Sequence, residues 1–163
     1  MERKVFFCFD YQRDLWRVKK IINLPHITSC AAAGFLDDEL WEETEMKGDE
    51  AVKKLIDDSL ENTSVTVLCI GERTVSRKFI DYEIEQSIRR GNGIVGIQIH
   101  HLKDTQGNVD SAGNIPYKIK TDYKVYKYVD HEELARHIEE AARGAGKWNE
   151  LAVLKISLKT YTL

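Results

Sequence analysis

The chain has 163 residues, of which 42% are hydrophobic and 31% are charged, and its formal net charge at pH 7 is −3. These values predict one globular domain with a single core, and they provide no general basic field for nucleic acid or an anionic membrane surface. No apolar run approaches the roughly 20 residues that a membrane-spanning helix needs, and Val5–Phe9 is too short for a secretory signal. The three cysteines, Cys8, Cys30 and Cys69, are expected to be buried thiols of a cytoplasmic protein, not a disulfide set or a metal site.

The first half of the chain alternates strand-like and helix-like segments. Apolar residues recur at helical spacing in two segments and run continuously in others, with Gly, Pro or Asn between them. In chain order, we predict a strand at residues 5–9, a helix at 13–22, a weaker strand at 26–32, a loop from 34 to about 48, a helix that begins at Asp49, and a buried strand at Val65–Ile70.

The next helix, predicted at Phe79–Arg90, carries a carboxylate on its apolar side. Ile80, Ile84 and Ile88 define one arc at about 100° per residue, and Glu83 falls inside that arc. A buried carboxylate must be paired, protonated or directed into a cleft. The helix follows a buried strand, and open α/β sheets bind ligands at the carboxyl ends of their strands. Helix geometry alone leaves two interpretations open: a catalytic acid, or an acid paired with a neighbour such as Arg77.

The second half continues the alternation and ends differently. Asp130 and Glu133 form a capping-box pattern that opens a last helix. In the final segment, residues 147–163, Leu154, Ile156 and Leu158 alternate with polar residues, as in a strand. We expect this tail to be ordered, either against a sheet edge or against a second chain. The other predicted elements are a helix end at Gly91, a strand at residues 94–99, an insertion at 100–123 with two Gly-Asn turns, and a strand at 125–129.

Strands that alternate with helices predict an α/β fold with a mainly parallel, five-stranded sheet. Runs such as Val65–Ile70 are apolar on nearly every residue, which predicts helices on both faces of that sheet. We divide the chain into a domain at residues 1–146 and a tail of unknown role at 147–163.

Common catalytic signatures are absent from the sequence, which contains no P-loop, no G-x-G-x-x-G after the first strand, no G-x-S-x-G and no H-E-x-x-H. The pair His100-His101 is interpreted as a surface pair because adjacent strand residues point in opposite directions. A phosphoacceptor domain is disfavoured because the third strand ends in Ile70-Gly71 and not in aspartate.

Several polar and aromatic residues should converge with Glu83 at the carboxyl ends of the first three strands. Each also has a structural interpretation: Asp10 could cap the first helix, Trp41 could fill the core and Arg77 could be solvated. Trp41 could instead stack on a purine, with nearby aspartates holding ribose hydroxyls. The converging residues are Asp10, Tyr11, Asp37, Trp41, Ser76 and Arg77.

The chain also carries an ordered series of motifs, the strongest of which is Ser76-Arg77-Lys78-Phe79-Ile80-Asp81-Tyr82-Glu83-Ile84. The others are residues 3–11, 16–18, 33–37, 40–42, 62–71 and 91–97. Together they resemble the bacterial and archaeal TIR-like proteins, and among these the ThsB-type subunits of Thoeris anti-phage defence. The resemblance covers about residues 1–142 and leaves out the tail.

The resemblance implies a flavodoxin-like TIR fold and cleavage of NAD between nicotinamide and ribose, with release of an ADP-ribose-derived signal. It places the catalytic glutamate at Glu83. NAD would be the substrate, with no separate cofactor and no metal, and a downstream effector would sense the product. Many TIR enzymes complete their site with a neighbouring subunit, so a homo-oligomer is also implied. By the same resemblance, the site's two sides are Phe9, Asp10 and Tyr11 for nicotinamide, and Asp37 and Trp41, with Ser76 nearby, for ribose and adenine.

Two positions depart from the family pattern. Cys8 and Asp10 stand where close relatives of the ThsB type lead us to expect serine and histidine. Both flank the nicotinamide end, so substrate handling or product identity could differ. The alternative function, of another class, is a non-catalytic TIR-like module that acts by association, with Glu83 as a structural acid.

Overall fold

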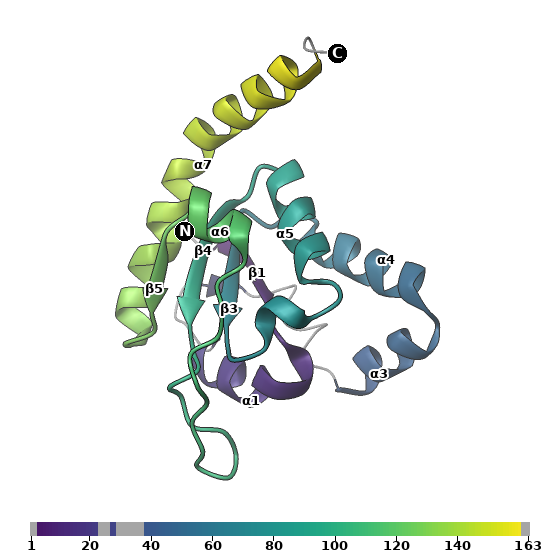
Figure 1. Ribbon diagram of the computed structural model, residues 1–163, viewed down its shortest axis with the longest axis vertical. Coiled ribbons are helices and arrows are strands. Elements are labelled where there is room, and N and C mark those ends of the chain that lie inside the picture. The colour runs from purple at the N-terminus through teal and green to yellow at the C-terminus, as the bar shows by residue number, and fades with distance from the viewer. Residues whose placement is uncertain (1–2, 23–26, 29–37, 161–163) are drawn as a thin grey trace.

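The computed structural model describes residues 3–22, 27–28 and 38–160 of the chain (Figure 1). Strands and helices alternate along this part of the chain. In order they are β1 (Arg3–Cys8), α1 (Tyr11–Ile21), β2 (Ile27–Thr28), α3 (Asp38–Met46), α4 (Asp49–Leu60), β3 (Val65–Ile70), the 3-10 turn η1 (Thr74–Ser76), α5 (Ile80–Arg89), β4 (Gly93–Gln98), α6 (Tyr117–Asp122), β5 (Val125–Lys127) and α7 (His131–Thr160).

The strands form one parallel sheet in the order β2-β1-β3-β4-β5. Four of them, β1, β3, β4 and β5, form a continuous ladder, and β2 adds two residue pairs at the edge beside β1. This order is that of flavodoxin-like folds. All six residues of β3 are buried, as its apolar sequence predicts for a strand between two layers of helices. The predicted α/β fold with a mainly parallel sheet is confirmed.

Helices cover both faces of this sheet. Side chains alternate between faces along a strand. Thr66 of β3 donates a hydrogen bond to Ser87 of α5, so the face of the sheet that carries the Thr66 side chain lies under α5. Val65 and its β4 partner Gly93 point to the other face, where a Cβ on Gly93 would collide with the backbone of Ala141 in α7. Figure 1 shows α5 and α7 on opposite sides of β3 and β4.

Several predicted boundaries are confirmed. One helix begins at Asp49, and Gly91 follows α5 with a φ of 76°, in the left-handed region that favours glycine. The backbone N–H of Glu133 donates to Asp130 Oδ1 at 2.8 Å, which is half of the predicted capping box.

The predicted loop at residues 34–48 is wrong for its second part, because residues 38–46 form α3. Among residues 39–46 of this helix, Trp41 and Thr44 are the buried ones. Two inward-facing residues are too few to produce a recognisable helical period in the sequence. The insertion at residues 100–123 likewise contains a short helix, α6. Of the weak strand at residues 26–32, only β2 falls in the described part.

The predicted strand at the C-terminus is also wrong. Residues 147–160 belong to α7, which runs without interruption from His131 to Thr160 and passes the domain boundary that we placed after residue 146. The apolar residues of the tail fit both periods, because Leu151, Leu154 and Leu158 recur at i, i+3 and i+7. The division into domain and tail stays a prediction.

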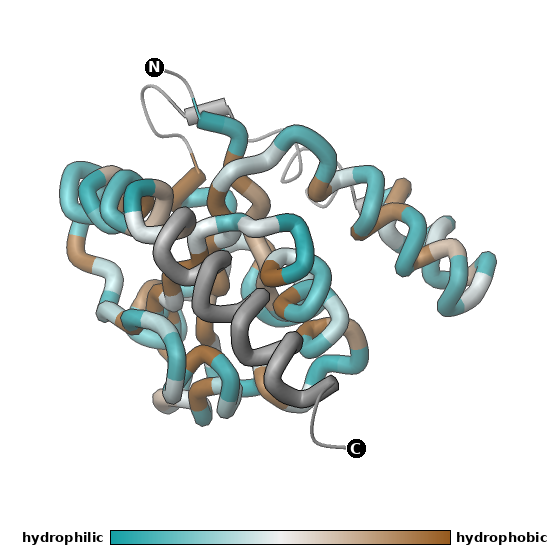
Figure 2. Tube along the Cα trace, turned by 90° about the horizontal axis from the view of Figure 1, so that it is seen from above, coloured by the Kyte–Doolittle hydropathy of each residue, from teal (hydrophilic) through white to brown (hydrophobic). Residues whose placement is uncertain are grey.

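The core follows the sheet. Brown, hydrophobic segments gather towards the middle of the tube in Figure 2, and teal predominates on the outer helices. Among the described helices, none combines the length and the apolar character that crossing a bilayer requires.

Candidate active site

Glu83 lies in the first turn of α5, on the side that packs against the sheet. Its exposure is only 4%, and it shares the buried side of the helix with Ile80, Ile84 and Ser87. The predicted position of Glu83 inside the apolar arc is therefore confirmed. The sheet residue that contacts its carboxylate, Cys8, comes from β1, the strand next to β3.

The carboxylate of Glu83 contacts a thiol. Cys8, the last residue of β1, lies in register with Leu68 of β3, so its side chain points to the α5 face of the sheet. Its Sγ donates to Glu83 Oε2 at 3.0 Å, and both side chains are buried. The interpretation of Glu83 as an acid paired with Arg77 is wrong, because Arg77 forms its ion pair with Asp10.

Burial changes the proton affinity of both groups. It raises the pKa of Glu83 to about 8, and the hydrogen bond from Cys8 offsets part of that rise. Burial, and then the charge of Glu83, hold the pKa of the Cys8 thiol well above its ordinary value. At pH 7 the site therefore contains a neutral carboxyl beside a neutral thiol. A cation that entered this dry environment would favour the ionised carboxylate.

Asp10 lies two residues after the end of β1 and is fully buried. Arg77 Nε approaches its Oδ1 at 3.2 Å and Arg73 Nη2 its Oδ2 at 3.3 Å. It occupies the N-cap position of α1 but makes no side-chain cap hydrogen bond. Its structural contribution is to fasten the loop between β3 and α5 to the carboxyl end of β1.

Three of the predicted binding residues form an aromatic cluster. Tyr11, at the start of α1, stacks on Trp41 of α3 with ring centroids 5.2 Å apart, and Phe9 lies 6.4 Å from Tyr11. Phe9 and Trp41 are buried, with 7% and 6% of their surface exposed. The structure thus brings the carboxyl end of β1, the start of α1 and helix α3 together, as the sequence predicts. The role of the three rings in binding stays a prediction.

The remaining predicted binding residues are Ser76 and Asp37. Ser76 is exposed, and its hydroxyl donates to the carbonyl of Arg73 at 2.8 Å, within its own turn. Asp37, and Cys30 of the cysteine set, lie outside the described residues. No cluster of three or more His, Cys, Asp or Glu side chains suited to a metal ion occurs in the described part of the chain.

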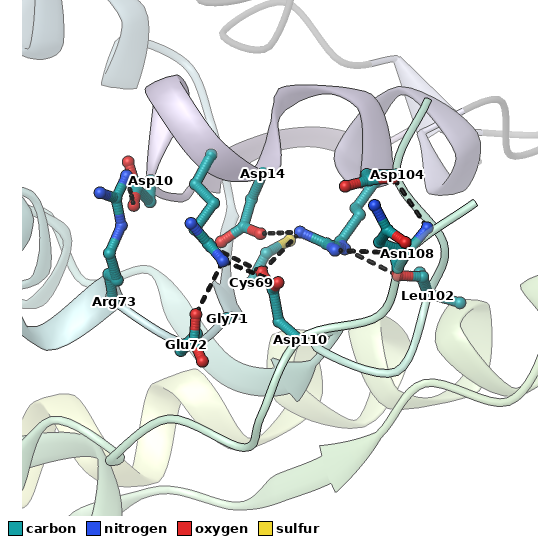
Figure 3. A network of polar contacts seen from close by, with 12 residues as sticks. Asp10, Asp14, Cys69, Gly71, Glu72, Arg73, Leu102, Asp104, Asn108 and Asp110 are labelled. Carbon is teal, nitrogen blue, oxygen red and sulfur yellow. Dashed lines mark hydrogen bonds and ion pairs between the residues drawn. The ribbon is translucent and has the colours of Figure 1, made fainter. Parts of the chain in front are cut away.

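Sequence reasoning missed a buried arginine. Arg17 of α1 is 1% exposed and fastens the strap, which we define as residues 100–116, to the helix. Figure 3 labels its partners, which are Asp14 of α1 and Leu102, Asn108 and Asp110 of the strap. Its guanidinium donates to Asp14 Oδ1 at 3.0 Å, Asp110 Oδ2 at 2.9 Å, and the carbonyls of Leu102 at 2.7 Å and Asn108 at 3.2 Å. The sequence does contain a pattern that indicates this contact. Arg17 lies beside Val18 on the inward side of an amphipathic helix, three residues after Asp14, which is the spacing of an ion pair along a helix.

Asp14 is buried beside the end of β3. Burial raises its pKa to about 6, against the lowering effect of the hydrogen bond from Arg17. A Cβ on Gly71 would collide with the Asp14 carboxylate, and one on Gly113 of the strap would collide with the Gly71 carbonyl. Glycine at these two positions lets α1, β3 and the strap pack without a gap.

A cavity of about 400 Å³ lies elsewhere, between β4, β5 and α7. Its lining includes Gly93, Tyr126 and His137, and the last two rings stack at 3.5 Å between centroids. Neither Glu83 nor any other predicted site residue lines it. The candidate site is therefore the closed cluster around Cys8 and Glu83.

Comparison with known proteins identifies the family of the chain. Residues 6–104 match the family model described as "Thoeris protein ThsB, TIR-like domain". The chain is also 39% identical over 153 residues to a Bacillus cereus (strain MSX-D12) protein named "Putative cyclic ADP-D-ribose synthase ThsB1". The alignment covers 92% of this chain and 76% of that relative.

Proposed function

The chain belongs to the ThsB family of TIR-like domains, and from this premise we propose that it cleaves NAD between nicotinamide and ribose, with Glu83 as the catalytic carboxylate. The product would be an ADP-ribose-derived nucleotide that signals in anti-phage defence. The observation that carries the proposal is the Glu83 carboxylate, buried on the inward side of α5 and held by Cys8.

The chemistry follows from the charge that develops on the sugar. When the bond between nicotinamide and C1 of ribose breaks, its electron pair leaves with nicotinamide, and the ribose becomes an oxocarbenium-like cation. A carboxylate beneath that cation stabilises it, and more strongly in a dry site than in water. The positive nicotinamide ring of bound NAD would also lower the proton affinity of Glu83, so substrate binding would itself produce the charged base form.

The fate of the cation decides the product. Attack by water would give ADP-ribose, whereas attack by an atom of the same molecule would give a cyclic nucleotide. The name of the Bacillus cereus relative, a cyclic ADP-D-ribose synthase, favours the cyclic product for this chain. An effector protein that binds this nucleotide would be the downstream partner.

Substrate access requires a rearrangement. Only 4% of Glu83 is exposed, so the ribose can reach it only if the packing around α5 opens. A second copy of the chain could hold the open form, which is why a homo-oligomer belongs to the proposal. If opening is coupled to activation, NAD cleavage would depend on the activating condition.

The test is to incubate the purified protein with NAD, with and without a lysate of phage-infected cells, and to identify the products by mass spectrometry. We expect free nicotinamide together with a cyclic or linear ADP-ribose derivative in at least one condition. Intact NAD in both conditions would overturn the proposal and leave a TIR-like module that acts by association.

A further inference from the structure

Glu83 is fixed at its backbone by a chain of polar contacts that reaches the sheet. Its carbonyl accepts a hydrogen bond from Ser87 Oγ at 2.7 Å, and Ser87 accepts one from Thr66 of β3 at 2.7 Å. Asn92 donates in turn to Thr66 Oγ1 at 3.2 Å. These groups are buried, so they fix the position of this turn of α5 relative to β3.

The side chain of Glu83 has a different anchor. Cys8 Sγ, on β1, donates to Oε2 at 3.0 Å. Oε1 receives no hydrogen bond from the described part of the chain, so it is the oxygen that can turn to a substrate. The backbone contacts set where Glu83 sits, and the thiol sets where its carboxylate points.

We propose that Cys8 is a positioning residue that orients the Glu83 carboxylate and sets the pH at which it becomes charged. The consequence for turnover rests on the proposed function, whereas the effect on the carboxylate does not. Cys8 does not touch the reacting atoms in this account, because it acts through Glu83.

The surroundings single out Cys8 as the group that controls Glu83. Of the elements packed against α5, β4 contributes no titratable side chain. From α4, Asp57 accepts from the Tyr82 hydroxyl at 3.0 Å, and Lys53 Nζ lies 5.5 Å from the centroid of the Tyr82 ring. Asp81 of α5 and Cys69 of β3 act on the Cys8 thiol. Burial raises the pKa of Glu83, and the hydrogen bond from Cys8 acts in the opposite direction and lowers it.

Three further charged groups lie nearby but are already paired with one another. Asp10 pairs with Arg73 and Arg77 in the loop before α5. The η1 turn itself, Thr74–Ser76, contains no titratable side chain. Among the described residues, the Cys8 thiol is therefore the polar partner through which the site can adjust Glu83.

The order of ionisation makes the thiol a donor at working pH. The pKa of Glu83 is about 8, and the pKa of Cys8 is raised well above its ordinary value. As pH rises, Glu83 loses its proton first and the thiol keeps its own, which gives an S–H to carboxylate hydrogen bond. A thiol is a weak donor, so it stabilises the charged form less than a hydroxyl would.

Substitution of Cys8 should therefore move the titration of Glu83 in two directions. In Cys8→Ser the stronger hydroxyl donor favours the carboxylate, and we expect its titration midpoint to fall by about one pH unit. In Cys8→Ala the donor is lost, and we expect the midpoint to rise by about the same amount. Cys69→Ala is the matched control, because it removes a buried sulfur that makes no hydrogen bond to Glu83 and should leave the midpoint unchanged.

The experiment follows the Glu83 carboxyl band by infrared difference titration in these variants, with Glu83→Gln to assign the band. The acid limb of kcat/KM for NAD is measured in parallel and should shift as the band shifts. Equal midpoints in Cys8→Ser, Cys8→Ala and the native protein would overturn the inference. If the carboxyl band shifts but none of the proteins cleaves NAD, the inference about Cys8 stands and the proposed function is refuted. If NAD is cleaved but neither the band nor the acid limb of kcat/KM shifts, the proposed function stands and the inference about Cys8 is refuted.

Discussion

At the scale of single residues, the site depends on where a strand and a helix place two side chains. The inward position of Glu83 follows from the spacing of Ile80 and Ile84, so helical period alone predicts it. The contact with Cys8 needs the strand register as well, because a shift of one residue would turn the thiol to the α7 face. That register is set by the paired ladder of β1 and β3, which no local pattern in either strand specifies.

Trp41→Ala should lower the stability of the fold. The indole is 6% exposed and stacks on Tyr11, and removal of a buried Trp typically costs about 3–5 kcal/mol. Trp41→Phe keeps an aromatic ring against Tyr11 and should cost less. Guanidinium unfolding of both variants, with an NAD titration of each, measures the effect. An unchanged free energy of unfolding together with lost NAD affinity would place Trp41 in an open binding cleft and not in the core.

At the scale of elements, the strap shows how a long insertion can be ordered without a strand of its own. Asp104 Oδ1 accepts from the backbone N–H groups of Gln106 and Asn108, both at 2.9 Å, around Gly107 with its φ of 82°. This is the turn that Gly107-Asn108 predicts. The attachment to α1 through Arg17 is a long-range contact, so the turn signals in the insertion could not reveal it.

Arg17→Met should destabilise the protein by about 3–5 kcal/mol, because it leaves buried carboxylates of Asp14 and Asp110 without their shared partner. Arg13→Met is the matched control, since Arg13 also pairs with Asp110, at 2.7 Å, but has 36% of its side chain exposed. It should have little effect on stability. Hydrogen exchange of the strap would report its release in Arg17→Met. Equal unfolding midpoints for the two variants would contradict the structural role of Arg17.

At the scale of the whole molecule, the sequence predicts the architecture better than the periphery. Alternating buried strands and amphipathic helices specify the parallel sheet, because each strand such as Val65–Ile70 must be covered on both faces. The strand predicted for the tail is wrong and the tail is helical, because its apolar residues satisfy both a period of 2 and a period of 3.6. In α3, where Trp41 and Thr44 face inward, tertiary packing stabilises a helix that the local sequence pattern does not predict.

The stability of the whole molecule should depend on pH through Glu83. Its ordinary pKa is 4.5 and burial raises it to about 8 in the folded protein, so the folded state keeps a proton that the unfolded state releases between these values. The free energy of unfolding should therefore fall as pH rises through this window, by on the order of a few kcal/mol. Glu83→Gln should lose most of this fall and keep only the part below about pH 6 that the raised pKa of Asp14 contributes. Glu85→Gln, at an exposed ion pair with Arg89, should keep the whole fall. Parallel pH profiles for the native protein and Glu83→Gln would contradict the buried, protonated state.

The most direct test of the central claim is the rate of nicotinamide release from NAD by the native protein, Glu83→Gln and Glu85→Gln under the same activating condition. The amide of Glu83→Gln keeps the shape of the side chain and removes the charge that stabilises the ribosyl cation, so we expect a loss of about 10²–10³-fold in rate with the fold intact. Glu85→Gln changes the same type of residue on the same helix and should release nicotinamide at the native rate. Native turnover by Glu83→Gln would contradict the assignment of Glu83 as the catalytic carboxylate.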